Sequence, residues 1–496
     1  MTTPLRPALA LAAALTSAVA LTTSAAPAST AADGVQSPLA AHWTESPVKG
    51  ADKLPAGITV TNWTEKTLEN RTRSRLLQVV EIDPTAAPLD LQSTVGPGGD
   101  GLAEKVADQL AGVSPVTSRH PLAGVNGGLF KSEPAHPDLK KDTRPLTLQH
   151  MGVSVTDGVL HSAGCFGRYG QGTNGAVIQY GVPYITRLST ELSLTAADRA
   201  FLRLDDINRD PGRARGCARD GDDEHQPEDQ VNDQRGVYTD PDEVVLFTSD
   251  YKYPVPKPGL DPYVTTDDDP GFEVVLDSAG KVTAARPGRG GGQGNKTEVY
   301  VPSGGRILQG VGTGATWLRD HAQLGTVLTV SQKLKDMTFG REIPLDPSVD
   351  VVGSFHQLLR DGDVPAALPD TCNQKGAGAD GTEICTDSRV ALGTNVRGHT
   401  VLVTLTGQPQ DSTTTTHEDG AWLHEFAELL DSEELGLIDA LNLDGGGSAT
   451  LITATTDAGT VVRTPPTDRE DGVYVHRPVA DAVYAGISGY GMYKKP

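Results

Sequence analysis

Short apolar runs separated by glycine, proline and polar residues dominate the chain, and this pattern favours strands over helices. Residues 75–82 (RLLQVVEI) and 244–248 (VVLFT) are rich in leucine and β-branched residues, as buried strands are. Residues 151–160 place two short apolar segments around Asp157-Gly158, a dipeptide typical of hairpin turns. Further strands are predicted at residues 57–63, 122–130, 272–276, 298–302 and 325–330.

Two segments have the spacing of amphipathic helices, at residues 102–110 and 421–430. The second is followed by an apolar strand at 437–443, a glycine turn at 444–448 and another strand at 449–453. We therefore predict an α+β fold, a strand-rich mixed sheet with few helices.

The N-terminal region has the features of a secretory signal peptide, which we place at residues 1–28. Arg6 precedes an apolar stretch at 8–20, and an A-x-A cleavage site follows. The alternative is a membrane anchor, but the apolar stretch is shorter than the ~20 residues that a membrane span needs. We expect residues 29–56 to be a flexible lead-in, residues 57–496 to form one catalytic domain, and the mature protein to be secreted without a membrane attachment.

Composition narrows the class of partner. The chain has 42 Lys and Arg against 64 Asp and Glu, which gives a formal net charge of −22. Such a chain repels nucleic-acid phosphates unless it carries a local basic patch, and no cluster of Lys and Arg stands out. We therefore expect no nucleic-acid partner. Hydrophobic residues make up 37% of the chain, which is enough for a sizeable core.

The four cysteines, in a chain expected to be exported, predict two disulfides. Of the three possible connectivities we favour Cys165–Cys217 with Cys372–Cys385, because each pair brackets one loop-rich region. A zinc site is the alternative, but the sequence shows neither C-x₂-C spacing nor nearby paired histidines.

Residues 205–243 form a polar insertion that is dense in charged and amide side chains. Its acidic cluster at residues 220–224 could be interpreted as a calcium loop, but the spacing differs from that of an EF-hand. We expect a solvated surface segment, since runs of charge usually face water.

The glycine turn carries the clearest chemical signal. Gly445, Gly446 and Gly447 allow a ligand to approach the main chain closely, and successive peptide N–H groups in such a turn can bind an anion. Asp444 at the strand end could act as an acid or base or hold a sugar hydroxyl, and Ser448 offers a hydroxyl. The alternative is a tight structural turn whose aspartate accepts backbone N–H groups.

Residues 442–451 (NLDGGGSATL) resemble the signature of the phosphodiester glycosidase family. Weaker segments match the family in the same order, at 123–130 (AGVNGGLF), 387–393 (DSRVALG) and 473–479 (VYVHRPV). Leu129 and Val390 depart from the residues usual at those positions. The resemblance spans about residues 57–495.

The resemblance implies an enzyme that removes a sugar from a glycosyl-1-phosphodiester. It implies catalytic roles for Asn126, Arg389 and Asp444. It implies substrate binding by Gly127, the three glycines of the turn, Ser448 and Arg477. The guanidinium fork of an arginine suits phosphate oxygens, so two arginines would let an acidic protein hold an anionic substrate.

The sequence allows alternatives for the second carboxylate, for a metal ion and for the reaction. Most glycosidases use two carboxylates, and Glu81 and Glu133 are both possible partners for Asp444. We expect no cofactor, because no ligand cluster requires a metal, although Asp444 and carboxylates of the insertion could contribute to one. The substrate partner is a glycosyl phosphate or a cell-wall polysaccharide. Alternative functions are a glycan-binding module without turnover, a phosphodiesterase that cuts the P–O bond, and a glycosidase for neutral sugars.

Overall fold

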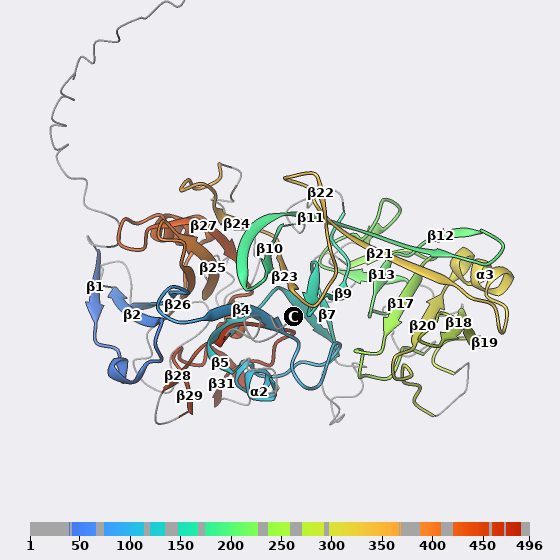
Figure 1. The fold of residues 1–496 in the computed structure, drawn as a ribbon, viewed down its shortest axis with the longest axis horizontal. Helices are drawn as coiled ribbons and strands as arrows, with labels where there is room; N and C mark the ends of the chain where they lie inside the picture. The colour runs from blue at the N-terminus through green and yellow to red at the C-terminus, as the bar shows by residue number, and fades with distance from the viewer. Residues whose placement is uncertain are drawn as a thin grey trace, which may run out of the picture. The chain divides into compact units, whose positions relative to one another are not determined.

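Strands, nearly all of them paired antiparallel, make up about half of the described chain in the computed structural model (Figure 1). The structure describes residues 39, 42–65, 74–113, 120–133, 147–166, 174–226, 237–257, 270–291, 297–366, 368, 387–407, 420–455, 459–470 and 473–487. Residues 37–496 group as one compact unit. The predicted signal peptide and the predicted pair Cys372–Cys385 lie outside the described residues.

Two sheets carry the strand ends at which the predicted site residues meet. A seven-stranded sheet has the order β1 (Trp43–Ser46), β2 (Ile58–Glu65), β3 (Arg75–Ile82), β26 (Thr400–Gly407), β25 (Arg389–Asn395), β27 (Leu437–Asn442) and β24 (Gln357–Leu359). A five-stranded sheet has the order β29 (Gly459–Val462), β28 (Leu451–Thr455), β5 (Pro121–Asn126), β32 (Ala482–Ile487) and β4 (Leu89–Thr94).

These two sheets pack face to face through one apolar core, in which Val80 of the first sheet and Val125 of the second are fully buried. Helix α4 (Leu423–Leu430) covers the other face of the seven-stranded sheet, where its Phe426 is fully buried. Helix α2 (Val106–Gly112) covers the other face of the five-stranded sheet. The layers therefore run helix, sheet, sheet, helix, and burial of both sheet faces is the main stabilising term.

The remaining strands build a second part of the same unit. An eight-stranded sheet has the order β22 (Arg341–Ile343), β21 (Thr329–Asp336), β11 (Val182–Thr195), β10 (Asn174–Gln179), β23 (Val349–Ser354), β8 (Ser154–Thr156) and β9 (Val159–Ser162), with β12 (Phe201–Arg203) paired to β11. Another five-stranded sheet has the order β13 (Asp206–Ile207), β17 (Val244–Thr248), β20 (Arg306–Gly310), β18 (Phe272–Leu276) and β19 (Val282–Pro287).

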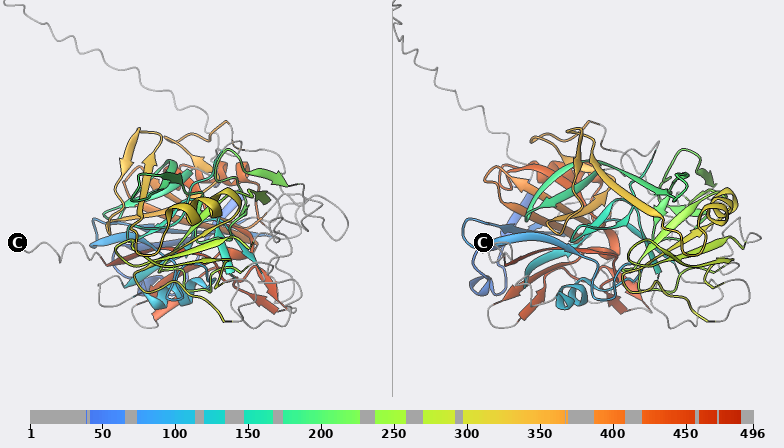
Figure 2. Two further views of the ribbon diagram at one scale, coloured as in Figure 1. Left: turned by 90° about the vertical axis from the view of Figure 1, so that its right-hand side faces the viewer. Right: turned by 45° about the vertical axis from the view of Figure 1, so that its right-hand side comes forward.

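Helix α3 (Gly312–His321) packs on β18 and β20, and this group lies away from β1 and β2 in Figure 1 and in the right-hand view of Figure 2. The smaller elements are β14 (Arg213–Arg215), β16 (Val237–Thr239) and β15 (Glu224–Gln226) in one sheet, the pairs β30 (Asp468–Glu470) with β31 (Val473–Val475) and β6 (Phe130–Glu133) with β7 (Thr147–His150), and the 3₁₀ turns η1 (Ala51–Lys53) and η6 (Gly446–Ser448).

The predicted fold class is confirmed: the described chain is strand-rich, with three α-helices among its described residues. Strands predicted at 75–82, 244–248 and 272–276 occupy those residues as β3, β17 and β18. The predicted hairpin is β8–β9, and Asp157 and Gly158 have the positive φ angles of a tight primed turn, 51° and 77°.

Some predicted elements differ. Residues 298–302 form no strand. Val299 and Val301 pack against the apolar cluster that contains Phe247, and the Val299 and Pro302 carbonyls accept the N–H groups of Val255 and Gly305. The strand predicted at 325–330 begins at Thr329. In place of the flexible lead-in expected over 29–56, residues 42–56 hold β1 and η1, because Trp43 is 97% buried and β1 pairs with β2.

The polar insertion is not the solvated segment that its composition predicted. Its described part adds β13 to a sheet and buries Arg209, Arg219 and Glu243, each 4% exposed or less. These charges are buried because they pair: Arg209 binds the carboxylates of Asp206 and Glu243, and Arg219 lies 3.0 Å from Asp206.

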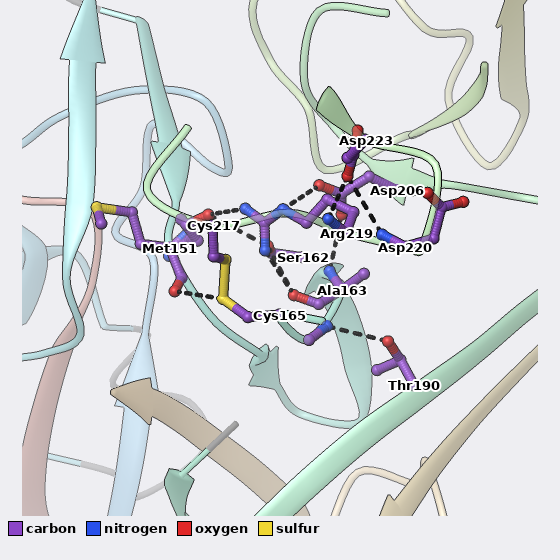
Figure 3. Close-up of a disulfide and its surroundings, with 12 residues drawn as sticks. Met151, Ser162, Ala163, Cys165, Thr190, Asp206, Cys217, Arg219, Asp220 and Asp223 are labelled. Carbon is purple, nitrogen blue, oxygen red and sulfur yellow. Dashed lines mark hydrogen bonds and ion pairs between the residues drawn. A yellow bond between two sulfur atoms is a disulfide. The ribbon is translucent and has the colours of Figure 1, made fainter. Parts of the chain in front are cut away.

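The predicted disulfide Cys165–Cys217 is present and joins the insertion to the segment after β9 (Figure 3). Its Cα atoms are 5.6 Å apart, within the usual range for a disulfide. Among the described residues, no helix has the length and apolar character that crossing a membrane requires.

Candidate active site

Antiparallel pairing brings the predicted residues together at neighbouring strand ends. Asn126 is the last residue of β5, and β5 pairs with β28 so that Asn126 faces Thr450 across the ladder. Arg389 is the first residue of β25, and β25 pairs with β27, which ends at Asn442 just before Asp444. The glycine turn therefore connects the two packed sheets at the point where both motifs end.

Main-chain hydrogen bonds fix the turn. Gly446 N–H donates to the Ser388 carbonyl at 2.8 Å, and Asp444 N–H donates to the Gly127 carbonyl at 3.0 Å. Thr467 Oγ1 donates to the Gly446 carbonyl at 2.8 Å. An ideal Cβ on Gly445 would lie 2.2 Å from the Ser388 carbonyl oxygen, so the residue just before β25 packs directly on the turn and leaves no space for a side chain.

Asn126 acts on the turn through its amide group. Its Nδ2 donates to the Asp444 carbonyl at 2.7 Å, and its Oδ1 accepts Thr450 N–H at 3.1 Å. The side chain is fully buried. These contacts hold the main chain on both sides of Gly445–Ser448, so the buried Asn126 side chain positions the turn.

Asp444 is partly exposed, and its carboxyl group has a raised pKa. Burial raises its pKa to about 6, an effect that the Ser448 hydroxyl and the charges of Arg477 and Lys131 oppose and that Asp387 reinforces. A carboxyl group with a pKa near 6 changes protonation state close to neutral pH, which suits a group that exchanges protons with a substrate or water.

Asp387 supplies a second carboxylate that the sequence analysis did not single out. It directly precedes Ser388 and Arg389, and its oxygens would lie 3.1 and 3.3 Å from an ideal Cβ on Gly446. Its charge acts on Asp444, Arg389 and Arg477 alike. The motif at 387–393 contained this residue, but sequence gave no sign that it faces the glycine turn.

The Arg389 guanidinium is a buried cation near both carboxylates. It is 8% exposed, and its Nε donates to the Ala421 carbonyl at 2.8 Å. No carboxylate among the described residues forms an ion pair with it. Burial lowers its pKa, while Asp387 and Asp444 raise it. Burial and the charge of Arg389 lower the pKa of His356 to about 4, so this neighbouring histidine is neutral at pH 7.

Arg477 lies on the exposed side of the turn. Its side chain is 38% exposed, and its Nε donates to Asp468 Oδ2 at 2.7 Å. An ideal Cβ on Gly447 would lie 2.5 Å from Arg477 Nη2, so the guanidinium rests against the α-carbon of this glycine. Although burial works against its charge, Asp468 and Asp444 raise the pKa of Arg477.

Donors without acceptors remain at the turn. Within the described part of the chain, the N–H groups of Gly445 and Gly447 have no acceptor, and Ser448 Oγ has no partner in full hydrogen-bonding geometry, although it is near enough to favour ionised Asp444. Ser448 is fully buried. Unpaired peptide N–H groups beside two arginines form a place where an anion can bind.

Glu81 does not reach this site. It contacts Asn395, Arg397 and His399 at the opposite end of β25 from Arg389. Asn395 lies six positions along the extended strand from Arg389, about 20 Å away. The side chain of Glu133 lies outside the described residues.

Carboxylates that could hold a metal lie elsewhere, in the polar insertion. Two overlapping groups have ligand atoms within 4.8 Å of one another: Asp205, Asp220 and Asp240, and Asp223, Asp240 and Glu243. Neither group includes Asp444 or Asp387. Burial raises the pKa of Asp205 to about 9 and that of Glu243 to about 7, so protons neutralise part of this cluster at neutral pH.

Comparison with solved structures shows a shared fold. An exported protein of Burkholderia pseudomallei superposes with a TM-score of 0.63 at 24% identity, over 84% of this chain and 75% of that one. A hypothetical protein of Synechocystis has a TM-score of 0.53 at 18% identity, over 88% of this chain and 64% of that one.

A third structure is the catalytic domain of zebrafish N-acetylglucosamine-1-phosphodiester α-N-acetylglucosaminidase, which matches over 90% of this chain and 88% of that one at 14% identity. Its TM-score is 0.34.

No curated protein matches the chain. A family model described as phosphodiester glycosidase matches residues 271–485, the segment that contains Asp387, Arg389, Asp444 and Arg477. The resemblance that the motifs indicated is therefore confirmed: over residues 271–485 this chain matches the phosphodiester glycosidase family.

Proposed function

We propose that the protein is a secreted hydrolase that releases a sugar from a glycosyl-1-phosphodiester. The observation that carries the proposal is the convergence of Asp444, Asp387, Arg389 and Arg477 on one glycine turn, within the segment that matches a family of phosphodiester glycosidases. A glycosyl phosphate or a cell-wall polymer that contains one is the substrate class.

The distribution of charge supports an anionic substrate. The chain as a whole has a formal charge of −22, so it needs local cations to hold a phosphodiester. Arg389 and Arg477 provide them beside the turn, and the N–H groups of Gly445 and Gly447 add two donors. A neutral glycoside would have no use for a buried guanidinium whose burial disfavours its charge.

The chemistry then needs a water and one ionised carboxylate. In the overall reaction the bond from the anomeric carbon to the phosphate oxygen breaks, and water supplies a hydroxyl group to that carbon. The products are the free sugar and a phosphomonoester, and the remaining proton passes to the base or the solvent. Phosphate leaves readily, so ionised Asp444 has the central role, either as the base that activates water or as the nucleophile.

Export is supported by three independent features. The sequence predicts a signal peptide, the Cys165–Cys217 disulfide suits an oxidising compartment, and the similar protein of Burkholderia pseudomallei is described as exported. Cell fractionation of the source organism with an antibody against the mature chain tests this part. Recovery of the uncleaved chain from the cytoplasm would refute export.

The reaction is tested by incubating the purified chain with a GlcNAc-α-1-phosphodiester and other glycosyl phosphodiesters in water labelled with ¹⁸O. Cleavage at the anomeric carbon places the label in the sugar, as we expect. Label in the phosphate identifies a phosphodiesterase that cuts the P–O bond. Saturable binding without product identifies a binding module. Turnover of neutral glycosides that survives the substitution Arg389→Ala identifies an ordinary glycosidase.

A further inference from the structure

Behind the candidate site, Asp481 accepts both N–H groups of the glycine pair that follows Asn126. Its backbone carbonyl accepts Gly127 N–H at 2.8 Å, and its Oδ1 accepts Gly128 N–H at 2.9 Å. Asp481 precedes β32 and is 2% exposed. An ideal Cβ on Gly127 would lie 2.3 Å from Asp481 Oδ1, so the carboxylate packs directly on the turn.

The Gly127-Gly128 turn holds the glycine turn that begins at Asp444. The Gly127 carbonyl accepts the N–H of Asp444 at 3.0 Å. The Asn126 side chain donates to the Asp444 carbonyl and accepts the N–H of Thr450, so it bonds to the main chain on both sides of the glycine turn. Two consecutive hydrogen bonds therefore connect the main chain of Asp481 to that of Asp444. A shift of the Gly127-Gly128 turn moves the peptide that carries the Asp444 carboxylate.

The second oxygen of Asp481 faces a buried histidine. Asp481 Oδ2 lies 3.9 Å from His150 Nδ1, and His150 Nε2 lies 3.2 Å from Asp100 Oδ1. His161 also faces the Asp100 carboxylate, and its Nδ1 lies 3.7 Å from Asp100 Oδ2. All four side chains are 4% exposed or less.

The charges in this cluster favour a protonated His150. Burial lowers the pKa of His150, but Asp100 and Asp481 on its two sides raise it further than burial and the charge of Arg219 depress it. Burial raises the pKa of Asp481, and His150 opposes that change. A protonated His150 between the two carboxylates therefore opposes the effect of burial on Asp481, whose Oδ1 accepts Gly128 N–H.

The polar insertion holds the strand that carries His150. Arg219 donates from Nη2 to the His150 carbonyl at 2.7 Å and from Nη1 to the Ala163 carbonyl at 3.0 Å. The Cys165–Cys217 disulfide lies beside these contacts (Figure 3). The insertion is thus connected to the site through buried side chains: Arg219 contacts His150 at the end of β7, and His150 faces Asp481.

We propose that Asp481 is a positioning residue for Asp444, held in place by the buried Asp100–His150 pair and, through Arg219, by the polar insertion. Its effect on catalysis rests on the proposed function; its effect on the turn does not. On this account the insertion is a structural support for the site and sets the geometry of Asp444 from the side away from the substrate.

Amide hydrogen exchange and kinetics test the proposal together. In Asp481→Ala, amide hydrogen exchange at Gly128 and Asp444 should accelerate at least about tenfold. The kcat should fall at least about tenfold while KM changes little, because the Asp444 carboxylate is displaced and the arginines that bind the substrate are not. Asp481→Asn keeps an acceptor oxygen at the same place, so it should restore most of both quantities.

Asp350→Ala is the matched control. Asp350 is 4% exposed and accepts Ser93 N–H at 3.3 Å and Asp157 N–H at 2.7 Å, with neither contact at the site. It should lose stability without accelerating exchange at Gly128 and Asp444. If Asp481→Ala does not fold, His150→Gln takes its place, with the same direction expected for exchange.

The outcomes separate the two proposals. Unchanged exchange at Gly128 and Asp444 in the Asp481 variant, equal acceleration in the Asp350 control, or no restoration by Asn overturns the positioning role. Absence of turnover by the wild type refutes the proposed function instead, and the exchange measurement still decides whether Asp481 positions the turn.

Discussion

A methyl group at Gly447 should displace Arg477 and so weaken substrate binding without unfolding the protein. The ideal Cβ lies 2.5 Å from Arg477 Nη2 and 2.8 Å from Asp468 Cβ, and ordinary contact begins at 3.4 Å. The guanidinium must therefore retreat by about 0.9 Å and the Asp468 side chain by about 0.6 Å. The side chain is 38% exposed and can move, but the movement disturbs its 2.7 Å bond to Asp468.

The expected effect of Gly447→Ala follows from that displacement. Misplacement of a binding group by about 1 Å can cost up to ~100-fold in rate, so kcat/KM should fall by about 10- to 100-fold, mostly through KM. The free energy of unfolding should change by less than about 1 kcal/mol, because a half-exposed ion pair contributes no more than that.

Gly445→Ala is the contrasting variant. Its Cβ would lie 2.2 Å from the Ser388 carbonyl oxygen, which is main chain of a buried strand end and cannot retreat as a flexible side chain can. Overpacking of this kind costs about 1–3 kcal/mol, so this variant should lose stability as well as activity.

Steady-state kinetics and denaturant unfolding of both variants provide the assay. A wild-type KM in a folded Gly447→Ala protein would refute the assignment of Arg477 as a substrate-binding cation. A Gly445→Ala protein with unchanged stability would refute the close packing of the turn on residue 388.

Three further predictions concern protonation and covalent structure. With ionised Asp444 required and its pKa at about 6, kcat/KM should rise about tenfold per pH unit below pH 6 and level off above it. Asp387→Asn removes a neighbouring negative charge and should move the inflection of this profile to lower pH. An unmoved inflection would contradict the electrostatic interaction between Asp387 and Asp444. Burial raises the pKa of Asp205 to about 9, so its contribution to stability is greatest below its ordinary pKa and is lost as pH rises toward 9; Asp205→Asn should raise the free energy of unfolding by about 1–3 kcal/mol at pH 8 and by less at pH 4, and chemical denaturation at both values checks the sign. The Cys165–Cys217 disulfide closes 52 residues, so replacing both cysteines by serine should cost about 2–4 kcal/mol, and a variant as stable as the wild type would contradict a structural role.

Sequence could predict the elements whose own residues determine them. The runs at Arg75–Ile82 and Val244–Thr248 are apolar enough to be strands in any sheet, and the Asp157-Gly158 turn needs only local chemistry. Helix α3 was missed because Gly312–His321 begins with glycines and has no strong apolar stripe; contacts with β18 and β20 decide its structure.

The site divides in the same way. Asn126, Arg389 and Asp444 could be named because each lies in a motif at a strand end, and strand pairing then brings them together. Asp387 and Asp481 could not, because their roles depend on which main chain their carboxylates face. The insertion was expected to be solvated because composition shows charge density, whereas burial depends on how arginines and carboxylates pair in space.

The central claim is that Asp444 performs the chemistry on a glycosyl phosphodiester. The most direct measurement is turnover of the mature wild type, Asp444→Asn and the control Asp350→Asn on a GlcNAc-α-1-phosphodiester, with unfolding curves for all three. We predict sugar release by the wild type and the control, and a loss of about 10²- to 10⁴-fold in a folded Asp444→Asn protein. Near-normal release by that variant would contradict the account.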